Sequence, residues 1–185
     1  SKRSLYGNKE IRRHRFIALR GFKQFYQDIP MAYKTGLNKT FTDHTGALAS
    51  LNIFRQVFYK TKFIYGFGRN EDIPEGFNVA LTAGYAIKQD RKRPYSGLDM
   101  SYAKFRRKGF YSNITIKVGG YFYDKRFEDI DLLFNVDHFT RLRKLSSSWF
   151  NRIFIATGIT AQANPVLNTQ LYLNSNFGLP YFNNG

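Results

Sequence analysis

Apolar and polar side chains alternate in this chain over segments of roughly ten residues, and the alternation recurs along most of its length. Ile114, Ile116 and Val118 share one face of such a segment, and the residues between them are polar. A strand that crosses a membrane in a β-barrel needs about 9–11 residues with one apolar face. The alternation therefore predicts an all-β protein, an antiparallel transmembrane β-barrel.

Nine segments carry this pattern, with glycine, asparagine, aspartate or basic residues between them. The predicted strands span residues 15–26, 47–60, 62–68, 77–88, 97–106, 110–123, 131–140, 149–161 and 166–174. A helix between Phe22 and Tyr33 is disfavoured by Pro30. Because no linker or shift in composition divides the chain, we predict one β-barrel region over residues 1–185 and no separate soluble domain.

A water-soluble β-sandwich would also alternate apolar and polar residues. Three features favour the membrane barrel. The segments exceed the usual strand length of about 5–6 residues. The predicted inward faces are rich in glycine, asparagine, aspartate and threonine, which suits a water-filled interior. Aromatic residues, 18% of the chain, bracket the segments like an interfacial girdle, as at 110–111 and 121–123.

The chain is strongly basic, with 29 Lys and Arg against 13 Asp and Glu and a formal net charge of +16. Such an excess favours a polyanionic partner, either nucleic acid or anionic lipid. The basic clusters lie mostly at segment ends and not along one face, as at 91–93, 106–108 and 141–144. In a barrel these positions are turns and rims, where cations meet lipid phosphates. We therefore expect lipid contact and not nucleic-acid binding.

The densest local motif is the run from Gly66 to Phe77, in which glycines and a proline bracket one cation and two carboxylates. These residue types are typical of a strand connection. The residues predicted to form this structural turn motif are Gly68, Arg69, Glu71, Asp72, Pro74 and Gly76. Within it, Arg69 is expected to pair with Glu71 or Asp72 and to order the turn.

Motifs for catalysis or cofactor binding are lacking in the sequence. The three histidines, His14, His44 and His138, are far apart and show no metal-ligand spacing. Neither a G-x-S-x-G nucleophile motif nor a phosphate-binding P-loop is present. We therefore predict no catalytic residue, no cofactor and no metal, and a protein that is not an enzyme by itself.

The run F-G-R-N-E-D-I-P-E-G-F, at residues 67–77, resembles bacterial outer-membrane barrels of the BamA/TamA-like surface-antigen type, in the form found in Bacteroidota. The segment R-P-Y-S-G at 93–97 is similar to the start of that family's next strand. Residues 135–139, 149–158 and 174–182 are similar to later parts of the same barrel.

This resemblance implies a location in the bacterial outer membrane and a role in inserting or moving proteins or lipids there. It implies a sixteen-stranded barrel in complete members, with membrane lipids, lipopolysaccharide and other outer-membrane or periplasmic proteins as partners. Since about nine strands do not make a closed single-chain bacterial barrel, we expect this chain to be a fragment of a larger one. Two alternatives are a passive barrel that anchors a soluble domain and a soluble basic β-protein that binds polyanions.

Overall fold

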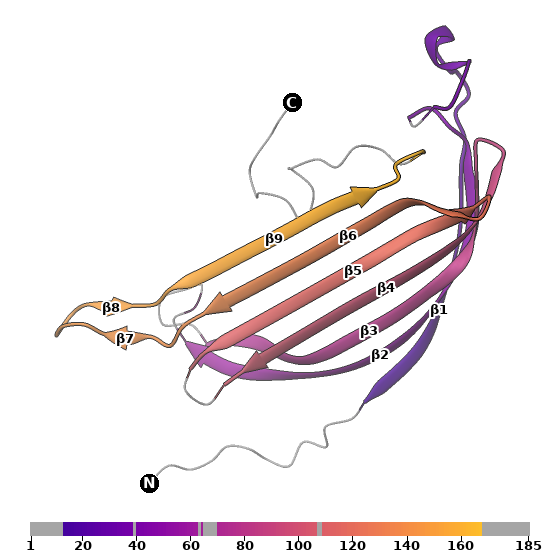
Figure 1. The fold of residues 1–185 in the computed structure, drawn as a ribbon. Helices are drawn as coiled ribbons and strands as arrows, with labels where there is room; N and C mark the ends of the chain where they lie inside the picture. The colour runs from indigo at the N-terminus through magenta and orange to yellow at the C-terminus, as the bar shows by residue number, and fades with distance from the viewer. Residues whose placement is uncertain (1–12, 39, 63, 65–69, 107–108, 168–185) are drawn as a thin grey trace.

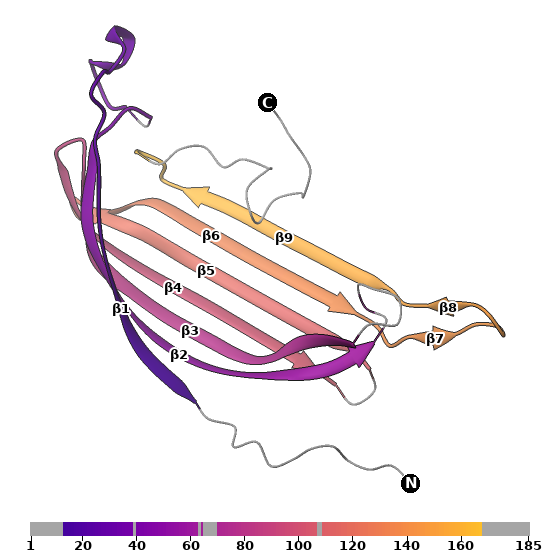
Figure 2. The same ribbon diagram turned by 180° about the vertical axis from the view of Figure 1, so that it is seen from behind.

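The computed structural model describes residues 13–38, 40–62, 64, 70–106 and 109–167. Its main feature is one antiparallel sheet of seven strands in the order β1-β2-β3-β4-β5-β6-β9 (Figure 1). The strands are β1 (His14–Gln24), β2 (His44–Lys62), β3 (Asn70–Lys88), β4 (Arg91–Phe105), β5 (Tyr111–Tyr123), β6 (Arg126–Phe139) and β9 (Phe154–Ala163). Figures 1 and 2 show that the sheet curves into an open trough, with β1 and β9 at its two edges.

The all-β, antiparallel fold predicted from the alternation is confirmed, but the described sheet is not closed into a barrel. Most predicted strands are present with shifted ends, and β2 and β3 are much longer than predicted, at 19 residues each. The strand predicted over 149–161 is interrupted, because a separate hairpin of β7 (Arg143–Lys144) and β8 (Phe150–Asn151) precedes β9. Most of the segments predicted over 62–68 and 166–174 lie outside the described residues.

Two tight turns define one end of the trough. Gln89 and Asp90 connect β3 to β4, and Asp124 and Lys125 connect β5 to β6, all four with positive φ between 45° and 62°. Two consecutive residues of this kind form the turn that suits the twist of a β-hairpin. The β1–β2 loop, with the short 3-10 helix η1 (Met31–Tyr33), lies at the same end. We call this the turn end, and the end with the β7–β8 hairpin the hairpin end.

The strand register places apolar residues in line across the whole sheet. One row joins Ile17, Leu51, Leu81, Leu98, Val118, Leu132 and Ala161. The next row on the same face joins Ile53, Val79, Met100, Ile116, Phe134 and Ile159 from β2 to β9. We call these two rows the apolar belt. Since successive residues of a strand point to opposite faces, the predicted separation of Ile116 from Thr115 and Lys117 is confirmed.

The opposite face is polar and lies on the concave side of the trough. One of its rows joins Ser50, Thr82, Gly97, Gly119, Asp131 and Gln162. Lys88, at the end of β3, donates a hydrogen bond of 2.5 Å to the carbonyl oxygen of Leu167, which follows β9. Because β4, β5 and β6 separate these two strands in the sheet, the two residues meet across the trough.

Neither face of the sheet is covered by a second layer within the described residues. The buried apolar side chains are few and lie mainly at the two ends, where Ile64, Ile73, Tyr111 and Phe139 form a cluster at the hairpin end. Most of the apolar belt is exposed or only half-buried. A soluble domain buries such a face against another element, and the described residues provide no such cover for the apolar belt.

Candidate functional site

Side chains of the polar face are linked across neighbouring strands. Lys117 Nζ on β5 lies 2.6 Å from Asp99 Oδ2 on β4, and both side chains are about one-third exposed. Gln162 on β9 donates a hydrogen bond of 2.9 Å to Asp131 on β6. Such cross-strand pairs hold the strands in register. They also give the concave face both signs of charge, which suits contact with water and polar ligands.

The middle of this face is hollowed around two glycines. Gly97 on β4 and Gly119 on β5 pair with each other in the sheet, and the ring of Tyr95 lies over both of them. A Cβ atom added at Gly97 would come within 2.8 Å of the Tyr95 hydroxyl. The hollow beside this ring is also lined by Thr82, Asp99, Lys117, Asp131 and Thr160. It is an open depression in the floor of the trough.

A buried cluster of charged side chains lies on the concave face of the sheet at the turn end. Arg93 Nη1 on β4 lies 2.6 Å from Asp129 Oδ2 and 3.2 Å from Glu128 Oε2, both on β6. Arg93 is only 1% exposed, and its guanidinium carbon lies 4.3 Å from the centre of the Tyr121 ring. Arg91 pairs with Glu128 at 2.9 Å and lies over Tyr123. Burying these charges is tolerated because each has a partner of opposite sign at hydrogen-bond distance.

Asp129 also fixes the chain that leaves β9. Its carboxylate accepts hydrogen bonds from the backbone N–H groups of Val166, at 2.5 Å, and Leu167, at 3.0 Å. Its own N–H donates to the carbonyl oxygen of Asn164 at 2.8 Å. Asp129 has a φ of +50° and lies with Ile130 in the register shift opposite Gly120, which turns its carboxylate towards these groups. The side chain of Leu167 is completely buried as a result.

The predicted turn motif is divided by the structure. Glu71, Asp72, Pro74 and Gly76 lie within β3 and not in a connection, because β3 begins at Asn70. Gly68 and Arg69 lie outside the described residues, and so does the predicted pairing of Arg69. Glu71 Oε2 accepts a hydrogen bond of 2.7 Å from the backbone N–H of Ile64, which follows β2. A carboxylate of the predicted motif therefore ties the end of β2 to the start of β3.

The charge of Glu71 also acts on a cation outside β3, Arg152. Burial lowers the pKa of the Arg152 guanidinium, and the negative charge of Glu71 opposes this fall. Arg152 lies between β8 and β9, and its guanidinium carbon is 5.2 Å from the centre of the Phe139 ring. The base of the β7–β8 hairpin therefore lies within the electrostatic reach of β3.

The predictions from the sequence do not include the buried charge cluster. The basic residues at 91–93 were predicted as a solvated rim, but Arg93 is buried because it lies in phase with the polar face of β4. The sequence did contain a signal that Arg93 belongs to the polar face. A spacing of two residues puts side chains on one face of a strand, and this spacing joins Arg93, Tyr95, Gly97 and Asp99. Its partners at 128 and 129 carried no such signal, because the register shift beside Gly120 changes the phase of β6.

Comparison with known proteins gives no match to a family model, a curated protein or a solved structure. Within the described residues, no helix is long and apolar enough to cross a membrane. Nor do three or more His, Asp or Glu residues of the described chain come together as a possible metal site.

Proposed function

We propose that this chain forms part of an outer-membrane β-barrel of the assembly or translocation type, which inserts or moves proteins or lipids at the bacterial outer membrane. The observation that carries the proposal is the apolar belt, which crosses the sheet while polar residues fill the opposite face. Strands of 10–19 residues are long enough to cross the hydrocarbon layer. Lipid is then the apolar partner that covers the belt, and the concave face lines the water-filled interior.

The strand directions support a barrel larger than the described sheet. Because each strand of the sheet is antiparallel to its neighbours, β1 and β9 run in the same direction. Pairing these two edges with each other would make a parallel contact. An antiparallel barrel that includes this sheet therefore requires an odd number of further strands. Two of the three connections at the turn end are two-residue turns, which supports a periplasmic position for that end although the β1–β2 loop there is long, and the hairpin end then faces the outside.

The assembly or translocation role rests on the resemblance of the 67–77 run and on the form of the trough. The concave face offers charged and polar groups to a moving chain, such as the Asp99–Lys117 pair. The β1 and β9 edges have free backbone groups within the described sheet. Such edges can accept an incoming strand by backbone hydrogen bonding.

The membrane placement is tested with single cysteines, since the chain has no native cysteine. Ile116→Cys and Val118→Cys are labelled with an environment-sensitive dye in lipid vesicles, with Thr115→Cys and Lys117→Cys as matched controls on the opposite face. We expect lipid-borne quenchers to act on positions 116 and 118 and water-soluble quenchers on 115 and 117. A sharp monomeric gel-filtration peak in plain buffer, with a β-rich circular dichroism spectrum, would overturn the membrane placement and favour a soluble polyanion-binding protein.

The assembly role needs a separate experiment. A urea-unfolded outer-membrane barrel protein is added to vesicles that contain the chain. Its folding is followed on a gel, where the folded barrel migrates differently from the heat-denatured one. We expect faster folding than in vesicles without the chain. If the folding rates are equal in the two kinds of vesicle while the apolar belt still lies in lipid, the chain is a passive anchor and has no assembly role.

A further inference from the structure

The β7–β8 hairpin projects beyond the sheet at the hairpin end (Figure 1). It is held by its own backbone hydrogen bonds, with Arg143 opposite Asn151 and Lys144 opposite Phe150. At its tip, the N–H of Leu145 donates to the carbonyl oxygen of Trp149 at 2.9 Å. At its base, the N–H of Thr140 donates to the carbonyl oxygen of Ile153 at 2.9 Å. These bonds make the hairpin an ordered element that can present its side chains to a partner.

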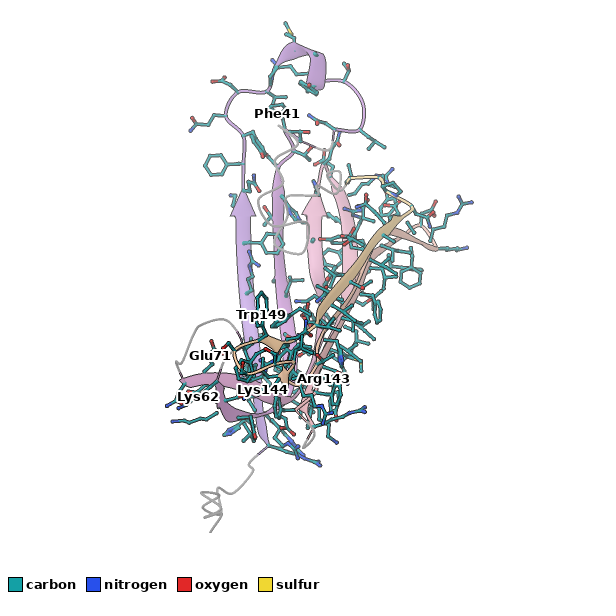
Figure 3. The ribbon with its side chains drawn as sticks, turned by 90° about the vertical axis from the view of Figure 1, so that its left-hand side faces the viewer. Phe41, Lys62, Glu71, Arg143, Lys144 and Trp149 are labelled. Atoms are coloured by element: carbon teal, nitrogen blue, oxygen red, sulfur yellow. The ribbon has the colours of Figure 1, made fainter. Side chains whose placement is uncertain are left out.

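The side chains of the hairpin are arranged in two zones. Three large apolar residues occupy the tip, where Trp149 is 72% exposed, Leu145 68% and Phe150 57%. The exposed cations Arg143 and Lys144 follow immediately behind them. Residues 139–153 contain no Asp or Glu at all. In Figure 3, Trp149, Lys144 and Arg143 lie close together at the end of the trough that faces the viewer.

An apolar tip backed by cations fits the boundary of an anionic membrane. Tryptophan prefers the headgroup level of a bilayer, where its ring is in the apolar layer and its N–H is hydrated. Lysine and arginine at that level meet lipid phosphates. The same end of the sheet carries further exposed cations, namely Lys60, Lys62, Lys104, Arg106 and Arg141. The positive charge is therefore not confined to the hairpin but extends along the rim.

The hairpin is also continuous with the proposed lipid-facing surface. Exposed Ile153 joins the hairpin to β9, and exposed Ile159 of the same strand belongs to the apolar belt. A partner that covers the belt therefore reaches the base of the hairpin without a break. We propose that the β7–β8 hairpin docks on the phosphate layer of anionic lipid at this end, with Trp149 in the interface and Arg143 and Lys144 on phosphates. This inference rests on the proposed function.

Trp149 provides the test, because it is the only tryptophan in the chain. The full chain is placed in phosphatidylcholine vesicles that contain increasing fractions of an anionic phospholipid, and tryptophan emission is recorded. We expect a blue shift with anionic lipid and quenching by bromine atoms attached near the headgroup end of the lipid tails. High salt should reverse the shift, because screening weakens the attraction between the cations and the phosphates.

The double variant Arg143→Gln/Lys144→Gln isolates the two cations. Each basic residue near an anionic surface contributes about a fivefold factor in binding. Removing both should weaken the binding of the hairpin about 25-fold, so the double variant should require a clearly higher fraction of anionic lipid for the same shift. The matched control is Lys125→Gln/Arg126→Gln at the turn end, which removes the same charge from two exposed residues and should leave the shift unchanged.

Two results would overturn the inference alone. One is an unchanged emission of Trp149 in anionic vesicles while a label at position 116 still reports lipid. The other is an equal shift when inorganic phosphate is added to phosphatidylcholine vesicles, which would show that the cations bind phosphate without a lipid surface. If the label at position 116 reports water, the proposed function has failed, and the inference falls with it.

Discussion

Arg93 Nη1 on β4 and Asp129 Oδ2 on β6 lie 2.6 Å apart, and both residues are only 1% exposed. The strands that carry them are not neighbours, since β5 lies between them in the sheet. The pair therefore reaches over β5 on the concave side. Through Asp129 it also holds the chain that leaves β9. This one pair thus links two strands that are not neighbours at the turn end, and Asp129 also fixes the path of the chain after β9.

Removing one partner of this pair should be strongly destabilising. Asp129→Ala leaves the Arg93 guanidinium with less of its compensating charge and also frees the N–H groups of Val166 and Leu167. We expect a loss of about 3–5 kcal/mol in the free energy of unfolding, measured by urea titration of the chain in lipid vesicles. The control Asp72→Ala, at an exposed position of β3, should cost less than about 1 kcal/mol. Similar losses for the two variants would mean that the pair has no special role.

The two faces of the sheet should differ in how much stability they lose when a charge is introduced. Ile116→Arg places a cation in the middle of the apolar belt and should cost roughly 2–4 kcal/mol in vesicles. Thr115→Arg, one residue away, places the same cation on the polar face and should cost little. The measurement is the urea midpoint of both variants in the same lipid. A larger loss for Thr115→Arg would invert the assignment of the faces.

Two glycines should differ sharply in their tolerance of a methyl group. A Cβ atom at Gly84 would clash with the backbone carbonyl of Ala47 on the neighbouring strand, whereas a Cβ at Gly21 on β1 meets no atom within 4 Å. We expect Gly84→Ala to cost about 1–3 kcal/mol, because a backbone carbonyl cannot move aside easily. Gly21→Ala should be neutral or slightly stabilising. Thermal unfolding followed by circular dichroism distinguishes them, and equal melting temperatures would refute the close pairing of β2 with β3 at Gly84.

The hydrogen bond between Glu71 and the N–H of Ile64 should slow amide exchange at Ile64. Glu71→Ala removes the acceptor, so exchange at this amide should become faster, while Glu71→Gln keeps a carbonyl oxygen in place and should restore part of the protection. Exchange at Val79, in the middle of β3, serves as the internal control and should not change. Unaltered exchange at Ile64 in Glu71→Ala would show that this bond does not hold the β2–β3 connection.

The sequence could predict the faces of the strands but not the partners of the charges. Ile116 was correctly predicted to lie on the opposite face from Thr115 and Lys117, because the side-chain period of two is a local property of an extended chain. Four residues of the predicted turn motif, Glu71, Asp72, Pro74 and Gly76, lie in β3, because their residue types suit turns but do not require one. β3 begins before the segment that the alternation marks, so Glu71 and Pro74 lie in it and pair with Thr61 and Phe58 of the long β2. Pairing with a neighbouring strand therefore overrode local turn preference at these positions.

The amino-acid sequence by itself determined that this protein is an antiparallel β-protein with one apolar and one polar face. Only the tertiary structure decided that Arg93 and Asp129 are buried together, that Lys88 reaches Leu167 across the trough, and that a separate hairpin carries Trp149 past the sheet. The physical reason is that the face of a residue depends on its neighbours in the chain, whereas its partners depend on the register of every strand between them. Register is a property of the whole sheet, and a single bulge beside Gly120 was enough to bring Asp129 to Arg93.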